Sequence, residues 1–374
     1  MPPRNPATDA APGPARFLVP PRAYLDASWL EHEQATLFDR SWALVAAAEE
    51  LAVPGDYVEA VVGRCPLMVV RTEQNGLRAF HNLCRHRGMA LVSGSGRLEG
   101  SIRCGYHGWR YGLEDGTLVQ VPQRAEQFAG IDTGCWGLRA ASVGQWGGMI
   151  FAHPDPEAAP FSEFAGDLFD KVGSYRPELL TQRARVRIEG RFNWKLFVEN
   201  HIDVLHLWYL HDGTLGAFDH PRFEHHHVGP HWASYEPLKA SVLEARQSRH
   251  GRQDHIGHIG HIEQRDRDGI GAHMLFPNIL FASAADFWIS YAVTPLAPDR
   301  SVIDLRVRAE PDADPEALVS AARAFIDEDV FACEQTQRAL SSPRFAVGPL
   351  ASAHEAPITT FQHHLLTILG DLTP

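Results

Sequence analysis

The chain has 374 residues, of which 44% are hydrophobic and 21% are charged, a composition typical of a globular protein with about two domains. The 46 acidic residues outnumber the 34 lysines and arginines, and the formal net charge of −12 argues against nucleic acid or an anionic membrane surface as a partner. No run approaches about 18 consecutive apolar residues, and the first residues lack the apolar stretch of a secretory signal. We therefore expect a cytoplasmic protein that binds neither nucleic acid nor a membrane.

Five cysteines in a chain of this length do not make a disulfide scaffold, and they fit a reducing compartment in which close Cys/His groups bind metal. Cys65, Cys135 and Cys333 are far apart in the sequence, and we expect them to be buried.

The first half of the sequence predicts a small all-β domain at 45–155. Residues 1–22 are rich in proline and are expected to form a disordered arm, whereas 23–44 has a helical pattern and should pack on the second domain. Short β-like runs separated by turn residues follow at 57–62, 66–71, 77–81 and 148–153.

The second domain, 156–374, mixes strands and helices. The sequence predicts a helix near 194–210, a His-rich irregular stretch at 220–270, and a closing helix from Asp314 to about Leu340 with Asp314 as its cap. Further β-like runs are expected at 272–282, 287–293 and 302–309. This segregation of strands and helices indicates an α+β fold.

The first group of candidate ligands consists of Cys84 and His86 in CRHRG and Cys104 and His107 in CGYHGW. Two thiolates and two imidazoles on tight loops can hold a single zinc ion or a two-iron cluster. A zinc ribbon is the less favoured alternative, because zinc sites usually combine a Cys-x-x-Cys pair with histidines.

The second group is Asp203, His206 and His211 within residues 193–215. Asp203 and His206 fall on a polar stripe of the predicted helix, which is either a solvated face or a metal site. On a straight helix His206 and His211 diverge by about 140°. Both can bind one metal only if the helix ends or bulges between them, and His211-Asp212-Gly213 is the expected end.

A third candidate, Asp329, lies on the apolar side of the closing helix, whereas Asp327 and Glu328 fall outside that side. A buried carboxylate needs a cation or a hydrogen-bond donor, so Asp329 is either a metal ligand or the partner of a donor inside the core.

These motifs together resemble those of the Rieske non-haem iron oxygenases, in the α (terminal oxygenase) subunit of the aromatic-ring-hydroxylating family. The resemblance extends over about residues 20–372 and includes NWKxxxEN, Asp-x-x-His-x4-His and the Asp-x4-Glu pattern of Asp329 and Glu334. It implies an α+β protein with a small all-β Rieske domain and a catalytic domain that has a curved antiparallel sheet and flanking helices.

The resemblance also assigns roles. Cys84, His86, Cys104 and His107 would bind a [2Fe-2S] cluster, and His206, His211 and Asp329 would bind a mononuclear Fe(II). Asp203 would be the bridging carboxylate between the two centres, in a head-to-tail homotrimer where one subunit's cluster serves its neighbour's iron.

The sequence has no dinucleotide-binding fingerprint, so electrons from NAD(P)H are expected to arrive through a separate flavin reductase, a ferredoxin or both. We expect O2 and a small aromatic, heteroaromatic or amine substrate, and monooxygenation by C-hydroxylation, N-oxygenation or demethylation. The residues expected around the substrate are Phe197, Leu205, Leu207, Leu210, Phe276 and Phe287. Ring cis-dihydroxylation is the alternative reaction, and a non-catalytic Rieske electron carrier is the alternative of another class.

Overall fold

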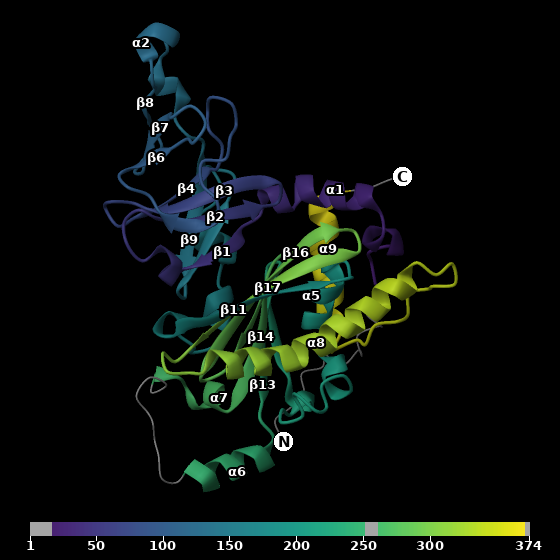
Figure 1. Ribbon diagram of the computed structural model, residues 1–374. Helices are drawn as coiled ribbons and strands as arrows, with labels where there is room; N and C mark the ends of the chain where they lie inside the picture. The colour runs from purple at the N-terminus through teal and green to yellow at the C-terminus, as the bar shows by residue number, and fades with distance from the viewer. Residues whose placement is uncertain (1–16, 251–260, 371–374) are drawn as a thin grey trace.

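The computed structural model describes residues 17–250 and 261–370. In the N-terminal half of the chain, short antiparallel strands form two sheets. Their bounds are β1 (Ala43–Ala47), β2 (Asp56–Val62), β3 (Cys65–Arg71), β4 (Leu77–His81), β5 (Ser95–Arg97), β6 (Ser101–Arg103), β7 (Arg110–Gly112), β8 (Leu118–Gln120), β9 (Ala140–Trp146) and β10 (Met149–His153). The larger sheet has the order β1-β10-β9-β4-β3-β2-β5, and β6-β7-β8 form the smaller one. Figure 1 shows the smaller sheet at the outer end of this lobe, beside α2 (Arg124–Gln127).

The C-terminal half contains another antiparallel sheet of seven strands, in the order β11-β17-β16-β15-β14-β13-β12. These strands are β11 (Thr181–Gly190), β12 (Glu224–Val228), β13 (His231–Pro237), β14 (Gly269–Leu275), β15 (Ile279–Ser283), β16 (Phe287–Ala297) and β17 (Arg300–Ala309). The remaining helices are α1 (Ala27–Thr36), α3 (Phe161–Ala165), α4 (Leu168–Lys171), α5 (Trp194–Ile202), α6 (Ala240–His250), α7 (Gln264–Arg267), α8 (Pro315–Leu340) and α9 (Ala356–Leu369).

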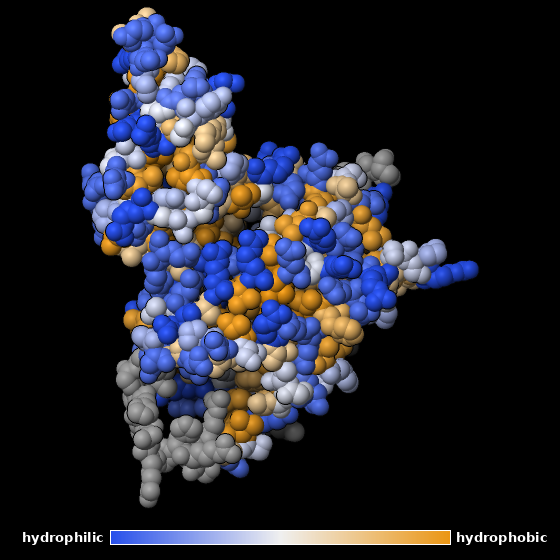
Figure 2. All heavy atoms as spheres, in the orientation of Figure 1, coloured by the Kyte–Doolittle hydropathy of each residue, from blue (hydrophilic) through white to orange (hydrophobic). Residues whose placement is uncertain are grey.

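Both faces of the sheet in the C-terminal half are covered. Successive side chains of a strand point to opposite faces, so each strand contributes to both cores. On β16, Ile289 and Tyr291 pack in the core beneath α5, α8 and α9, whereas Trp288 packs in a second core with Trp42 and Phe151 of the first lobe. The two lobes therefore share a hydrophobic core. Figure 2 shows a mostly polar surface on the face where α8 lies, with apolar residues also reaching it.

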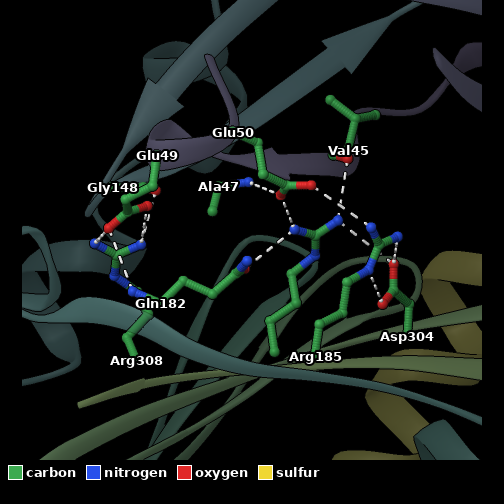
Figure 3. A network of polar contacts seen from close by, with 10 residues as sticks. Val45, Ala47, Glu49, Glu50, Gly148, Gln182, Arg185, Asp304 and Arg308 are labelled. Atoms are coloured by element: carbon green, nitrogen blue, oxygen red, sulfur yellow. Dashed lines mark hydrogen bonds and ion pairs between the residues drawn. The ribbon is translucent and has the colours of Figure 1, made fainter. Parts of the chain in front are cut away.

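The same alternation sends two arginines of β17, Arg306 and Arg308, toward the first lobe. Figure 3 shows Arg308 beside Glu49 and Gly148. Buried Arg308 lies 2.8 Å from Glu49 and donates to the carbonyl of Pro177, and buried Arg306 is paired with Glu50. Both arginines are buried, while their carboxylate partners keep some contact with solvent. These pairs hold the first lobe in a defined orientation on the sheet.

The segment that contains α1 packs on the C-terminal half through a buried ion pair. Glu33 lies 2.6 Å from the Lys195 ammonium and accepts a hydrogen bond from Trp194 Nε1 at 2.8 Å. Trp194 and Lys195 open α5, whose first N–H groups are capped by the Asn193 side chain. The NWK motif thus joins α1 to the helix that precedes the candidate metal ligands.

The described residues confirm the four predicted β runs of the first half, and Asp314 caps α8 with Pro315 at its first position. The prediction of a disordered arm at 1–22 is wrong for 17–22. The amides of Leu18 and Val19 donate to Gln362, and a 3-10 helix begins at Pro21, so packing against α9 orders these residues. Residues 1–16 lie outside the described part.

Several boundaries also differ from prediction. The helical segment 23–44 ends at β1, whose first residue, Ala43, already pairs with β10. The stretch 220–270 is not irregular, since β12, β13, α6 and α7 lie within it; residues 251–260 of that stretch are outside the described part. The run 272–282 is two strands joined by a turn with a cis bond before Pro277, and α9 follows the helix predicted to close the unit.

Among the cysteines expected to be buried, Cys333 is buried, Cys65 is half-buried and Cys135 is exposed. In the described part of the chain, no helix combines the length and hydropathy needed to cross a lipid bilayer.

Candidate metal centres and substrate cavity

Two loops of the first lobe have the same backbone hydrogen-bond pattern. In one, the amide of Gly88 donates to the carbonyl of Cys84, and in the other Gly108 donates to Cys104. Each cysteine amide donates in turn to the carbonyl five residues later, and both glycines have positive φ, at 76° and 71°. Glycine suits this left-handed backbone because it has no Cβ. The paired motifs thus fold as two equivalent tight loops.

The four candidate cluster ligands form a cysteine pair and a histidine pair. Cys84 and Cys104 are buried, whereas the Nδ1 atoms of His86 and His107 face each other 3.2 Å apart on the exposed side. Within the described residues, no three of these side chains bring their ligand atoms within 4.8 Å of one another. Two separated pairs suit the two irons of a cluster better than the single tetrahedral ion of a zinc ribbon.

Aromatic side chains flank the ligands of this site. Trp109 is buried and stacks on the His86 ring at 4.9 Å, whereas Tyr106 is 56% exposed. The Tyr111 hydroxyl accepts from the Arg85 amide and lies 3.3 Å from Cys84 Sγ, so its own hydrogen can be donated to that sulfur.

The second group of ligands depends on where α5 ends. The helix stops at Ile202, before both histidines, and Asp203 already has extended backbone. A 3-10 turn at Leu205–Trp208 follows, and His211 comes after it. The expected end at His211-Asp212-Gly213 is therefore wrong. The earlier end removes the divergence of about 140° that a straight helix would impose.

The structure brings His206 and His211 together with Asp329 of α8. One oxygen of Asp329 lies 2.8 Å from His211 Nε2 and 3.5 Å from His206 Nε2. All three residues offer ligand atoms within 4.8 Å of one another. Two imidazoles and one carboxylate, with positions left open, are the donor set of non-haem iron sites, so the residues fit a mononuclear Fe(II).

A carboxylate stands behind each of these imidazoles. His211 Nδ1 lies 2.7 Å from Glu328, which also accepts from the Thr214 hydroxyl. His206 Nδ1 is 3.6 Å from Asp203 Oδ2, beyond hydrogen-bonding distance, and is buried with no hydrogen-bond partner in the described part of the chain. Each Nε2 therefore faces the candidate metal position, while each Nδ1 faces a carboxylate that can orient the ring.

These charges act on one another strongly. Burial lowers the pKa of His206, but Asp203 and Asp329 outweigh burial and raise it to about 9. Burial raises the pKa of Asp329, but hydrogen bonds with His206 and His211 outweigh it and hold that pKa below its usual value. Asp329 thus lies between two imidazoles, and a metal ion bound by this group would displace any proton held on their ligand nitrogens.

The three residues open into a cavity of about 300 Å³ between α8 and the face of the sheet that carries Tyr291. Its wall is mostly apolar. Of the residues expected around the substrate, Leu207 and Phe287 line it, whereas the prediction is wrong for the rest, which are Phe197, Leu205, Leu210 and Phe276.

The sequence patterns did not single out three residues of the site. Glu328 was placed outside the apolar face of its helix, and only the tertiary fold brings His211 beside it. His201 and Glu236 also line the cavity. Burial lowers the pKa of His201 to about 4, so this imidazole is neutral. Alternation along the strand around Glu236 is the only signal that would have suggested it.

Residues 177–371 match the family of ring hydroxylating alpha subunits (catalytic domain), and residues 41–137 match the Rieske [2Fe-2S] domain. The chain is a Rieske non-haem iron oxygenase α subunit. The α+β expectation is thereby confirmed, with a β Rieske domain beside a catalytic domain of antiparallel sheet and helices.

Among its relatives, the oxygenase is 33% identical over 211 residues to the carnitine monooxygenase oxygenase subunit of Escherichia coli (strain K12), and this match covers 56% of each chain. It is 25% identical over 375 residues to the glycine betaine monooxygenase oxygenase subunit of Chromohalobacter salexigens, which covers 92% of this chain and 84% of that one. The 2,4-dinitrotoluene dioxygenase large oxygenase component of Burkholderia sp. is 35% identical over 205 residues, or 52% and 44% of the two chains. The chain thus spans only about half the length of several of these relatives.

The fold is shared with solved oxygenases. A quaternary ammonium Rieske monooxygenase in complex with L-carnitine superposes with a TM-score of 0.78 at 22% identity, over 95% of this chain and 96% of that one. A naphthalene 1,2-dioxygenase with bound indole gives a TM-score of 0.72 at 20% identity, over 94% and 91%.

Proposed function

We propose that the two Cys/His loops hold a [2Fe-2S] cluster and that His206, His211 and Asp329 hold a mononuclear Fe(II). When bound, the cluster supplies electrons and the Fe(II) supplies the redox chemistry that activates O2. The protein's own contribution is to converge three ligand atoms at the wall of a largely apolar cavity, which is the observation that carries the proposal. A pure electron carrier has no need of such a cavity.

We propose Asp203 as the carboxylate that links the two centres between subunits of a homotrimer. Asp203 lines the cavity and faces His206 Nδ1 with one oxygen, while its other oxygen accepts from the Leu205 amide at 2.7 Å. The loop between β6 and β7, which contains Cys104 and His107, lies in the outer part of the Rieske lobe, away from α8 (Figure 1). This separation within one chain supports electron transfer from a neighbouring subunit. A reductase or ferredoxin would deliver the electrons from NAD(P)H.

We infer that the reaction is monooxygenation of a small amine, by C-hydroxylation, N-oxygenation or demethylation. The size and apolar wall of the cavity suit a compact substrate, and two of the relatives are named as monooxygenases of carnitine and glycine betaine. Ring dihydroxylation is the second candidate, supported by the apolar wall and by the dinitrotoluene dioxygenase relative.

We also propose a division into a Rieske domain at 45–155 and a catalytic domain at 156–374.

Metal and sulfide analysis tests the class of site. The oxygenase should contain about three Fe and two sulfides per chain, whereas a carrier would contain about two Fe, and a ribbon Zn without sulfide. Oxygen uptake with a surrogate reductase should then be stimulated by small amines, and the product should contain one atom from labelled O2. Two labelled atoms in an arene product would replace the monooxygenase proposal with the dioxygenase one.

A further inference from the structure

Glu236 is a buried carboxylate on the cavity wall, outside the candidate iron site. It lies on β13, where Trp232, Ser234 and Glu236 alternate with side chains of the opposite face, and all three line the cavity. Glu236 is 6% exposed, although its neighbour across the sheet is the apolar Ile270. A carboxylate in such surroundings requires a partner.

Among the residues that the structure describes, only one oxygen of Glu236 has a partner. Oε2 lies 3.2 Å from His220 Nδ1, whereas Oε1 is buried and has no hydrogen-bond partner. The other carboxylates of the cavity, Asp203 and Asp329, face histidines. An unsatisfied buried carboxylate oxygen is costly, and a cation or N–H donor from a ligand would offset that cost.

The remaining wall favours a cation of low hydration. Phe218, Phe223 and Trp232 line the same cavity, and the rings of Phe223 and Trp232 lie 6.1 Å apart. Aromatic faces attract organic ammonium groups through the ring quadrupole. No lysine or arginine lines the cavity in the described part of the chain, so no permanently charged side chain competes for Glu236 or offers itself to a substrate carboxylate.

We infer that Glu236 holds the positively charged nitrogen of the substrate, and that the substrate is a small organic cation without a carboxylate. This inference rests on the proposed function as an amine monooxygenase and assigns the residue that selects for charge. Glu236 supplies the negative charge and the aromatic side chains enclose the alkyl groups, while the candidate iron site lies elsewhere on the same cavity wall.

Calorimetric binding to the metal-loaded protein tests the inference without turnover. Choline should bind at least about tenfold more tightly than 3,3-dimethylbutan-1-ol, its neutral isostere in which carbon replaces nitrogen. Dimethylaminoethanol is protonated at neutral pH, so the ratio of its affinity to that of choline measures whether an N–H donor to Oε1 adds affinity. Glycine betaine, which adds a carboxylate, should bind more weakly than choline.

The Glu236→Gln variant should lose the preference for choline while its affinity for the neutral isostere stays within about twofold, which also shows that the cavity is intact. The matched control is Glu224→Gln, which removes an exposed carboxylate on the adjacent strand β12. An unchanged preference for choline in Glu236→Gln overturns the inference, and so does an equal loss of affinity for choline and for its neutral isostere. Tighter binding of glycine betaine than choline overturns the claim that the substrate lacks a carboxylate.

Oxygen uptake separates the inference from the proposed function. If amines stimulate uptake but Glu236→Gln keeps the charge preference, the inference fails and the proposed function stands. If the charge preference depends on Glu236 but only neutral arenes are oxygenated, the amine monooxygenase proposal fails.

Discussion

The Nδ1 atom of His211 lies 2.7 Å from Glu328 Oε2, and the opposite ring nitrogen lies 2.8 Å from Asp329. Two successive residues of α8 thus contact both nitrogens of one imidazole. A carboxylate behind a ligand histidine fixes its tautomer and raises its basicity. We therefore interpret Glu328 as a positioning residue for the candidate iron site.

Glu328→Gln should weaken Fe(II) binding by about 10- to 100-fold, because the ring loses its anionic partner. Competition with a chelator measures the affinity, and the visible absorption of the cluster serves as an internal reference. Asp327→Asn is the matched control, since Asp327 is exposed and pairs only with Arg323 of the same helix. Equal affinities in wild type and Glu328→Gln would show that Glu328 does not position the ligand.

Asp329→Ala should remove the mononuclear iron and leave the cluster, because the two sites share no residue. Iron should fall by about one atom per chain with unchanged sulfide and visible spectrum. His206→Ala should give the same pattern. Full iron content and activity in Asp329→Ala would rule out its assignment as third ligand.

Asp203→Asn should retain both metal centres and reduce turnover by about 100-fold or more, because the link between centres requires accurate placement. The amide keeps the shape of the side chain and can still accept from the Leu205 amide. Iron and sulfide analysis provides the control, and steady-state oxygen uptake the readout. Wild-type turnover would exclude the bridging role.

Tyr111→Phe should lower the reduction potential of the cluster, because the hydroxyl donates toward Cys84 Sγ and such bonds favour the reduced state. A bond of roughly 1 kcal/mol corresponds to about 40 mV for one electron. Redox titration followed by electron paramagnetic resonance measures the shift. Tyr57→Phe, which removes a hydroxyl bonded to the Ser93 carbonyl at the lobe surface, should leave the potential unchanged.

Glu199→Gln should change how stability depends on pH. Burial raises the pKa of Glu199 to about 7, despite hydrogen bonds from Tyr24 and Gln362. A carboxyl whose folded pKa is raised stabilises the fold fully below its unfolded pKa, and this stability is lost as pH rises through the folded pKa.

Between pH 5 and 8 the free energy of unfolding of the wild type should therefore fall by up to about 3 kcal/mol relative to that of Glu199→Gln. Urea denaturation at several pH values measures the difference, and Glu189→Gln, at an exposed position of β11, is the control. Parallel pH profiles for wild type and Glu199→Gln would contradict this account.

The types of ligand at each candidate centre could be predicted from the sequence, because that information is local. Cys84 and His86 stand in one tight loop, and Cys104 and His107 in another, so spacing alone predicts two ligand pairs. Asp329 was selected by helical periodicity, since a carboxylate on an apolar face requires a partner wherever that face is buried.

Which residues surround those ligands could not be predicted, because it depends on how distant segments pack together. α5 ends at Ile202 although neither glycine nor proline stands there, so His206 lies in the following 3-10 turn and His211 comes after it. Glu328 contacts His211, and Glu236 contacts His220. In each pair the two residues are more than ten positions apart in the sequence. Periodicity describes one element at a time, so it cannot show which neighbour a side chain will face.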